Sequence, residues 1–206
     1  LNIPYEANFK ERGGRVFFMA EYHKVMQKVG LNFFGMVDLV EPASNRSKTS
    51  SWGSWMSASG PHVCNVKEGV LLGYKESHVK LDKGISQWDY EEVDVLGKSR
   101  KVYKEEDKKE FMELVFAEWP YFADTRSLTK ATFSEDIPSK AIKIFTYKDD
   151  LVLDCFSGSG TTAISAKKLG RRYLGFEISP QYFEISKKRI RKLEERGLPK
   201  ESKWTL

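Results

Sequence analysis

The fold of this 206-residue chain is decided by the stretch Leu151-Val-Leu-Asp-Cys-Phe-Ser-Gly-Ser-Gly-Thr-Thr-Ala163. Residues 151–156 are typical of a buried strand, residues 157–160 of a tight turn, and residues 161–169 of a helix that Gly170 ends. The flanking predictions are a short helix at 137–145, a second strand at 173–178 and a long helix at 180–196. A strand, a helix and another strand in this order form a βαβ unit, so the sequence predicts an α/β fold with a doubly wound parallel sheet.

The turn after the first strand has the residues expected of a nucleoside-binding site. Gly158 and Gly160 let the backbone turn sharply and approach a ligand, because a Cβ atom there would clash. Glu177 ends the second strand, where doubly wound sheets place a carboxylate that accepts hydrogen bonds from ribose. A phosphate-binding loop is disfavoured, because the Lys-Ser/Thr ending of a P-loop is absent and Ala163 occupies the third glycine position of the dinucleotide motif.

The earlier part of the chain has less regular patterns. The predicted elements are a helix at 16–29 ended by Gly30, strands at 1–5, 31–40 and 69–74, and a loop at 43–62. Residues 75–134 are charged and irregular apart from a helix candidate at 105–118, so we interpret them as an insertion.

Composition excludes several classes of protein. With 40% hydrophobic residues the chain can bury an ordinary core, which disfavours disorder and coiled coil. No apolar stretch approaches the ~20 residues of a membrane-spanning helix. Cys64 and Cys155 are the only cysteines and the three histidines have no ligand spacing, so we expect no disulfide framework, no metal and a reducing, cytoplasmic environment.

The formal charge of +5 is unevenly distributed. The basic residues gather in two groups: Lys98, Arg100, Lys101 and Lys104, and then Lys187, Lys188, Arg189, Arg191, Lys192, Arg196 and Lys200. Each group is interpreted either as a solvated surface or as a phosphate-binding surface.

The glycine turn and its surroundings resemble a known family. Asp154-Cys-Phe-Ser-Gly-Ser-Gly-Thr-Thr162, Leu169-Gly-Arg-Arg-Tyr-Leu-Gly-Phe-Glu177 and Pro180-Gln-Tyr182 are similar to the S-adenosylmethionine motif of the amino-directed DNA methyltransferases, which methylate adenine N6 or cytosine N4. The resemblance implies a Rossmann-like S-adenosylmethionine-dependent methyltransferase sheet. Cys155 departs from the pattern, which usually has Pro there.

The resemblance also implies which residues bind the cofactor. They are Asp154, Phe156, Ser157, Gly158, Ser159, Gly160, Thr161 and Glu177. The loop from Phe156 to Gly160 would hold the methionine part and Glu177 the ribose hydroxyls. Asp154 would fix the loop or the amino group of the cofactor.

The order of the parts matches the β-type members, in which a target-recognition segment separates the catalytic half from the cofactor motif. The implied parts are residues 1–75, the later part of the catalytic half; residues 76–134, the target-recognition insertion; and residues 135–206, the S-adenosylmethionine-binding part of the same α/β domain. Residues 51–61 resemble a loop near the family's catalytic pocket. There, Trp52 and Trp55 either stack on DNA bases or fill the core beneath the loop.

The family's catalytic tetrapeptide, Asp/Asn/Ser-Pro-Pro-Tyr/Phe, does not occur in the sequence. Asn2-Ile-Pro-Tyr5 fits a relaxed form found in rRNA adenine dimethylases, which makes Asn2, Pro4 and Tyr5 catalytic candidates. Those enzymes, however, place the cofactor motif before the tetrapeptide, and residues 1–30 resemble the family segment that follows the catalytic motif. We therefore expect an N-terminally truncated member whose catalytic motif lies upstream of Leu1.

The resemblance implies a site-specific methyltransferase of a restriction-modification system that acts on double-stranded DNA. Overall similarity favours adenine N6 over cytosine N4 as the acceptor. One alternative is a cofactor- and DNA-binding half that is inactive without a separate chain carrying the tetrapeptide. Another is an RNA adenine methyltransferase, which the motif order disfavours. Formation of a homodimer is left open by the sequence.

Overall fold

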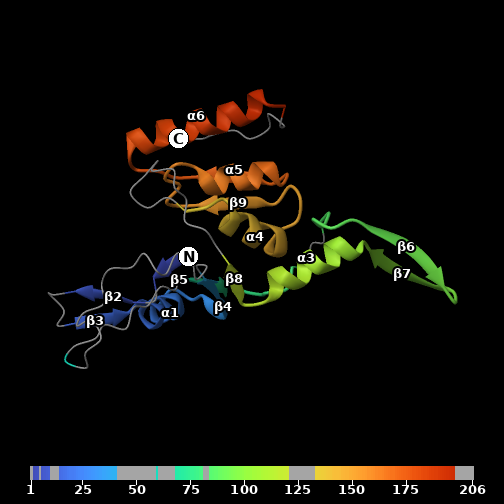
Figure 1. The fold of residues 1–206 in the computed structure, drawn as a ribbon, viewed down its shortest axis with the longest axis horizontal. Coiled ribbons are helices and arrows are strands. Elements are labelled where there is room, and N and C mark those ends of the chain that lie inside the picture. The colour runs from blue at the N-terminus through green and yellow to red at the C-terminus, as the bar shows by residue number, and fades with distance from the viewer. Residues whose placement is uncertain are drawn as a thin grey trace. The chain divides into compact units, whose positions relative to one another are not determined.

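The computed structural model describes residues 2–4, 6–9, 14–40, 59, 68–80, 84–120 and 133–197, with side chains from residue 17 onward. The chain forms two compact units (Figure 1). Unit 1 comprises Leu1–Leu81 with Phe116–Phe122, and unit 2 comprises Asp82–Val115 with Ala123–Leu206. No described helix is long and apolar enough to cross a membrane.

Unit 1 contains a four-stranded sheet in the order β1-β5-β4-β8. Its strands are β1 (Asn2–Pro4), β4 (Asn32–Val40), β5 (Glu68–Tyr74) and β8 (Glu118–Pro120). β5 is antiparallel to β1 and β4, whereas β8 is parallel to β4. A separate hairpin joins β2 (Glu6–Phe9) to β3 (Gly14–Phe17).

The predicted helix of unit 1 is α1 (Phe18–Lys28), which Gly30 follows at a positive φ of 77°. Met19 of α1 and Leu71 of β5 form a small core with partly buried neighbours that include Met26. The helix and the strands at 31–40 and 69–74 are therefore confirmed, and residues 2–4 are a strand as expected. The predicted loop at 43–62 lies outside the described residues, except for Ser59.

Unit 2 contains the predicted βαβ unit. Its elements are α4 (Asp136–Phe145), β9 (Leu151–Asp154), α5 (Thr161–Lys168), β10 (Arg172–Gly175) and α6 (Pro180–Glu195). β9 and β10 are parallel, with Leu151 opposite Arg172 and Asp154 opposite Gly175. Apolar side chains from α4, α5, β10 and α6 form the core, namely Ile142, Ala163, Ile164, Ala166, Tyr173 and Ile190.

The second strand ends at Gly175, three residues before the predicted end at 178. The Glu177 carboxylate accepts hydrogen bonds from the backbone N–H groups of Gly158 and Ser179, which turns the chain into α6. Ser179 then caps α6, because its hydroxyl accepts a hydrogen bond from the Tyr182 N–H and Pro180 follows at the first helical position.

The interpretation of residues 75–104 as irregular is wrong. They contain an antiparallel hairpin of β6 (Tyr90–Val95) and β7 (Lys98–Tyr103), and α3 (Glu105–Val115) follows. Leu96 and Gly97 form its two-residue turn with φ values of 57° and 75°, the signature of a type I′ hairpin turn. Leucine seldom adopts a positive φ and half of the residues in the two strands are charged, so neither the turn nor the alternation was visible in the sequence.

Candidate functional site

The loop between β9 and α5 has the sharp turn that its glycines predict. Gly158 and Gly160 have φ values of 53° and 79°, in the left-handed region that L-residues with a side chain rarely adopt. A Cβ on Gly160 would lie 2.9 Å from the Cβ of Ser186 on α6, so this glycine also permits close packing of the loop against the helix. A Cβ on Gly158 would meet only the Phe156 carbonyl oxygen, at 3.9 Å.

Glu177 connects the glycine loop to the beginning of α6. Its Oε2 accepts a hydrogen bond of 2.7 Å from the Gly158 N–H, and its Oε1 accepts one of 2.8 Å from the Ser179 N–H. An ionised carboxylate offers about four lone-pair positions, so about two remain for the hydroxyl groups of a ligand. The half-buried Glu177 thus lies at the loop, as predicted, and is held in a fixed orientation.

Asp154 fixes the start of the same loop. Its Oδ1 accepts a hydrogen bond of 3.0 Å from the Phe156 N–H, a short-range Asx turn. The Ser157 N–H donates to the Phe176 carbonyl at 2.9 Å, which ties the loop to the chain after β10. The Phe156 ring itself is 87% exposed and therefore available to a ligand.

Ser157 carries an unsatisfied polar atom at the bottom of the loop. Its side chain is only 7% exposed, and its hydroxyl has no hydrogen-bond partner within the part of the chain that the structure describes. A buried hydroxyl without a partner costs about 1–3 kcal/mol, so its presence at a candidate ligand site is informative. The oxygen is inaccessible in this conformation, so a ligand reaches it only after the loop moves.

Arg189 of α6 holds the other side of the loop. Its Nη1 donates to the Ser159 carbonyl at 2.6 Å, to the Ser159 hydroxyl at 2.9 Å and to the Thr161 hydroxyl at 3.3 Å. Its Nη2 also lies 3.6 Å from Glu135 Oε1. The interpretation of Arg189 as part of a solvated or phosphate-binding surface is therefore wrong, because its guanidinium is bound to the loop.

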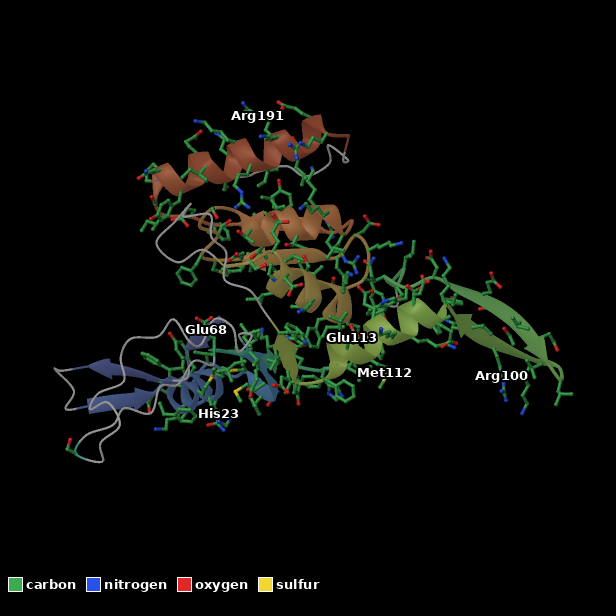
Figure 2. The ribbon with its side chains drawn as sticks, in the orientation of Figure 1. His23, Glu68, Arg100, Met112, Glu113 and Arg191 are labelled. Atoms are coloured by element: carbon green, nitrogen blue, oxygen red, sulfur yellow. The ribbon has the colours of Figure 1, made fainter. Side chains whose placement is uncertain are left out.

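The sequence contained one sign of this role. Arg189 lies three residues after Ser186, the residue that packs against Gly160, so both face the loop from one side of α6. Its neighbours differ, because Lys187 pairs with Glu184 at 3.1 Å and Arg191 points outward (Figure 2).

The catalytic candidates lie elsewhere in the chain. Asn2 and Pro4 belong to β1 in unit 1, where they pair with Val70 and Glu68 of β5. Their side chains and all of Tyr5 lie outside the described residues. The predicted DNA-contacting residues Trp52 and Trp55 also lie outside the described residues. Among the residues that are described, no three His, Cys, Asp or Glu side chains gather to hold a metal ion.

Together, the parallel βαβ unit and its carboxylate-bound glycine loop define a Rossmann-like α/β protein. Comparison with known sequences identifies the family: the N6_N4_Mtase model, described as DNA methylase, matches residues 7–188. The chain therefore belongs to the amino-directed DNA methylase family, as its motifs predicted.

Curated relatives agree with this assignment. The chain is 44% identical over 61 residues to the type II methyltransferase M.BglI of Bacillus subtilis, which covers 30% of this chain and 18% of the relative. It is 34% identical over 110 residues to the type II methyltransferase M.MjaVI of Methanocaldococcus jannaschii, which covers 53% of this chain and 54% of the relative. The chain thus spans between about a fifth and about half of the length of these two relatives.

Solved structures support the fold. A putative DNA modification methylase from Thermus thermophilus, complexed with S-adenosyl-L-methionine, has a TM-score of 0.63 at 18% identity and is matched over 100% of this chain and 71% of its own. The cytosine-N4-specific PvuII DNA methyltransferase has a TM-score of 0.60 at 16% identity, over 96% of this chain and 63% of its own. The expected Rossmann-like methyltransferase fold is confirmed.

Proposed function

We propose that this chain binds S-adenosylmethionine and serves a restriction-modification methyltransferase that methylates an exocyclic amino group in double-stranded DNA, adenine N6 in preference to cytosine N4. The observation that carries the proposal is the glycine loop, held by Glu177 on one side and Arg189 on the other, with the buried Ser157 hydroxyl beneath it. The family assignment adds the reaction class. Because its substrate is cellular DNA, the protein works in the cytoplasm.

The loop has suitable groups for each part of the cofactor. The remaining acceptor positions of Glu177 suit the two hydroxyls of a ribose. The loop from Phe156 to Gly160 holds the methionine part. Asp154 keeps the loop in its turn through the Phe156 N–H. When bound, S-adenosylmethionine supplies an electrophilic methyl group on its sulfonium.

The acceptor needs further groups. The lone pair of an exocyclic amino nitrogen is delocalised into the base, so an amide or carboxylate must accept hydrogen bonds from the amino group while the nitrogen attacks the methyl group. The base must also leave the duplex to reach the site. The alternative that we keep is a cofactor- and DNA-binding part that works with a separate chain carrying the family's tetrapeptide for this task.

Titration calorimetry with S-adenosylmethionine tests the cofactor site. We expect binding by the parent chain and at least about tenfold weaker binding by Glu177→Gln, because hydrogen bonds to a charged acceptor contribute about 1.5–3 kcal/mol. Glu184→Gln is the matched control, since Glu184 lies on α6 with its side chain 57% exposed. A folded parent chain without cofactor binding would refute the proposal.

Transfer of a labelled methyl group tests the reaction. The chain is incubated with duplex DNA and with RNA, and the modified nucleoside is identified by mass spectrometry. N6-methyladenine in DNA supports the proposal in full, whereas N4-methylcytosine corrects the acceptor. Cofactor binding without transfer supports the second candidate. Transfer confined to RNA would contradict a DNA substrate.

A further inference from the structure

The β6–β7 hairpin is an exposed two-stranded ribbon in unit 2. Every residue of β6 is exposed, and only Tyr103 of β7 is partly buried. The ribbon extends beyond α3 in Figure 1, and Figure 2 shows the Arg100 side chain projecting from it. Because cross-strand partners share one face of a ribbon, the register assigns each side chain to one of two faces.

On the first face, here called the closed face, the polar groups are paired with one another. Its residues are Tyr90, Glu92 and Asp94 opposite Tyr103, Lys101 and Ser99. The Ser99 hydroxyl donates to Glu92 Oε2 at 3.1 Å, and Lys101 Nζ lies 3.9 Å from the centre of the Tyr90 ring. With Glu92 and Asp94 against Lys101, the closed face has a formal charge of −1, which does not attract the phosphates of DNA.

The second face, here called the open face, presents cations without such pairing. Its residues are Lys98, Arg100 and Val102 opposite Val95, Val93 and Glu91. Within the described ranges, neither Lys98 nor Arg100 forms an ion pair or a side-chain hydrogen bond. The valines between them are 38–46% exposed, so the open face is cationic with apolar side chains interspersed.

The base of the ribbon is attached to the α-helical part of unit 2. Trp88 Nε1 donates to Glu110 Oε2 of α3 at 2.9 Å, and Glu110 forms an ion pair with Lys143 of α4. Burial raises the pKa of Glu110, but the hydrogen bonds from Lys143 and Trp88 outweigh this effect, so the pKa lies below its ordinary value. The ribbon and α3 are thereby tied to α4.

Two further contacts join this base to the residues that precede β9 and β10. The Lys148 N–H donates to the Ile85 carbonyl at 2.9 Å, and Arg171 Nη1 donates to Gln87 Oε1 at 2.7 Å. Arg171 is only 4% exposed, and burial lowers its pKa. The ribbon is therefore anchored to the elements that carry the glycine loop.

We propose, on the basis of the function proposed above, that the open face of the β6–β7 ribbon enters the major groove of the target DNA and that Arg100 contacts base edges there. The major groove, about 12 Å wide, admits a two-stranded ribbon, and an arginine fork matches the O6 and N7 acceptors of guanine. Lys98 at the turn contacts a phosphate, and the valines suit thymine methyl groups. The cationic open face is complementary to DNA, whereas the closed face is not.

Duplex binding measured by fluorescence anisotropy, with a pool of duplexes of randomised centre, tests this proposal. We expect Arg100→Ala to weaken binding to the preferred sequence by about tenfold or more. Lys98→Ala reduces the slope of log affinity against log salt by about one. Lys101→Ala, the matched control with the same change of charge on the closed face, leaves affinity within about twofold of the parent.

Arg100→Lys separates base recognition from charge. We expect it to keep the salt slope but to lose sequence preference in the pool, because lysine lacks the bidentate fork. Equal effects of Arg100→Ala and Lys101→Ala, or no effect of Arg100→Ala, would overturn the proposal. So would binding of duplex RNA in preference to DNA by the parent chain.

Cofactor calorimetry on the same samples distinguishes this proposal from the proposed function. Variants that bind S-adenosylmethionine like the parent are folded, so a lost DNA interaction then belongs to the ribbon. Normal DNA binding by Arg100→Ala with cofactor binding intact refutes the ribbon and leaves the proposed function standing. A parent chain that binds cofactor but no duplex refutes the ribbon as a DNA contact, and one that binds neither refutes both proposals.

Discussion

Replacement of Gly160 by alanine perturbs the loop in two separable ways. The first is conformational, because Gly160 has a φ of +79° and an L-residue in the left-handed region costs roughly 1–2 kcal/mol. The second is steric, because the new methyl group would lie 2.9 Å from the Cβ of Ser186, a side chain that is 1% exposed. An added methyl in a packed interior costs about 1–3 kcal/mol.

The expected loss of unfolding free energy for Gly160→Ala is therefore about 2–5 kcal/mol, a large part of the ~5–15 kcal/mol that stabilises a typical domain. Gly158→Ala is the control that has only the conformational cost, since its nearest new contact is 3.9 Å away. We expect it to lose about 1–2 kcal/mol. Gly170→Ala, with φ +72° and nothing within 4 Å, should lose a similar amount without affecting the cofactor site.

Urea unfolding followed by far-ultraviolet circular dichroism measures these losses, and cofactor calorimetry accompanies it. Ser186→Gly removes the atom that clashes, so in a double-mutant cycle it should recover about 1 kcal/mol or more of the Gly160→Ala loss. The reasoning is refuted if Gly160→Ala is no more destabilising than Gly158→Ala, or if Ser186→Gly shows no coupling to it.

Three other substitutions give sharp expectations. Arg189→Met removes the hydrogen bonds that hold the loop, so it should lower the unfolding free energy in urea by about 1–3 kcal/mol and also weaken cofactor binding. Arg191→Met, at an exposed position, should change neither quantity. Equal effects of the two substitutions would contradict the role assigned to Arg189. Arg171→Met leaves partly buried carbonyl groups without their guanidinium donor and should lower the calorimetric unfolding temperature. An unchanged temperature would count against the anchor. Folding lowers the pKa of Glu110, so its ion pair with Lys143 stabilises the protein above the ordinary pKa of 4.5, and this contribution is lost as pH falls through the lowered pKa. The difference in unfolding free energy between the parent and Glu110→Gln, measured in urea, should therefore vanish in acid. A difference that persists there would contradict the stabilising role of this ion pair.

The elements that the sequence predicted well are those whose pattern is local. The βαβ unit was visible because apolar runs, a glycine turn and a Ser179-Pro180 helix start follow one another within about sixty residues, each with its own stereochemical reason. Glu177 lies two residues after the observed end of β10 and binds the glycine loop, whereas its role toward a cofactor stays a prediction. The family assignment, which rests on these local motifs, was confirmed by the match over residues 7–188.

What the sequence did not show depends on contacts between distant residues. In the sequence, Arg189 cannot be distinguished from its basic neighbours. Its role depends on a hydrogen bond to Ser159, which lies thirty residues earlier in the chain. The β6–β7 ribbon was missed because its strands lack a buried face, so no hydrophobic alternation marks them. The part boundaries at 75 and 134 and the cofactor roles of individual residues stay predictions.

The hydrogen bonds that shape the glycine loop determine which of its positions tolerate substitution. Residues outside the turn hold its backbone: Asp154 binds the Phe156 N–H and Glu177 the Gly158 N–H, so the side chains at 155 and 156 contribute little to its shape. Cys155, which is exposed, lies within this segment. Its thiol offers a place to attach a fluorescent reporter beside the loop while the anchoring hydrogen bonds stay intact.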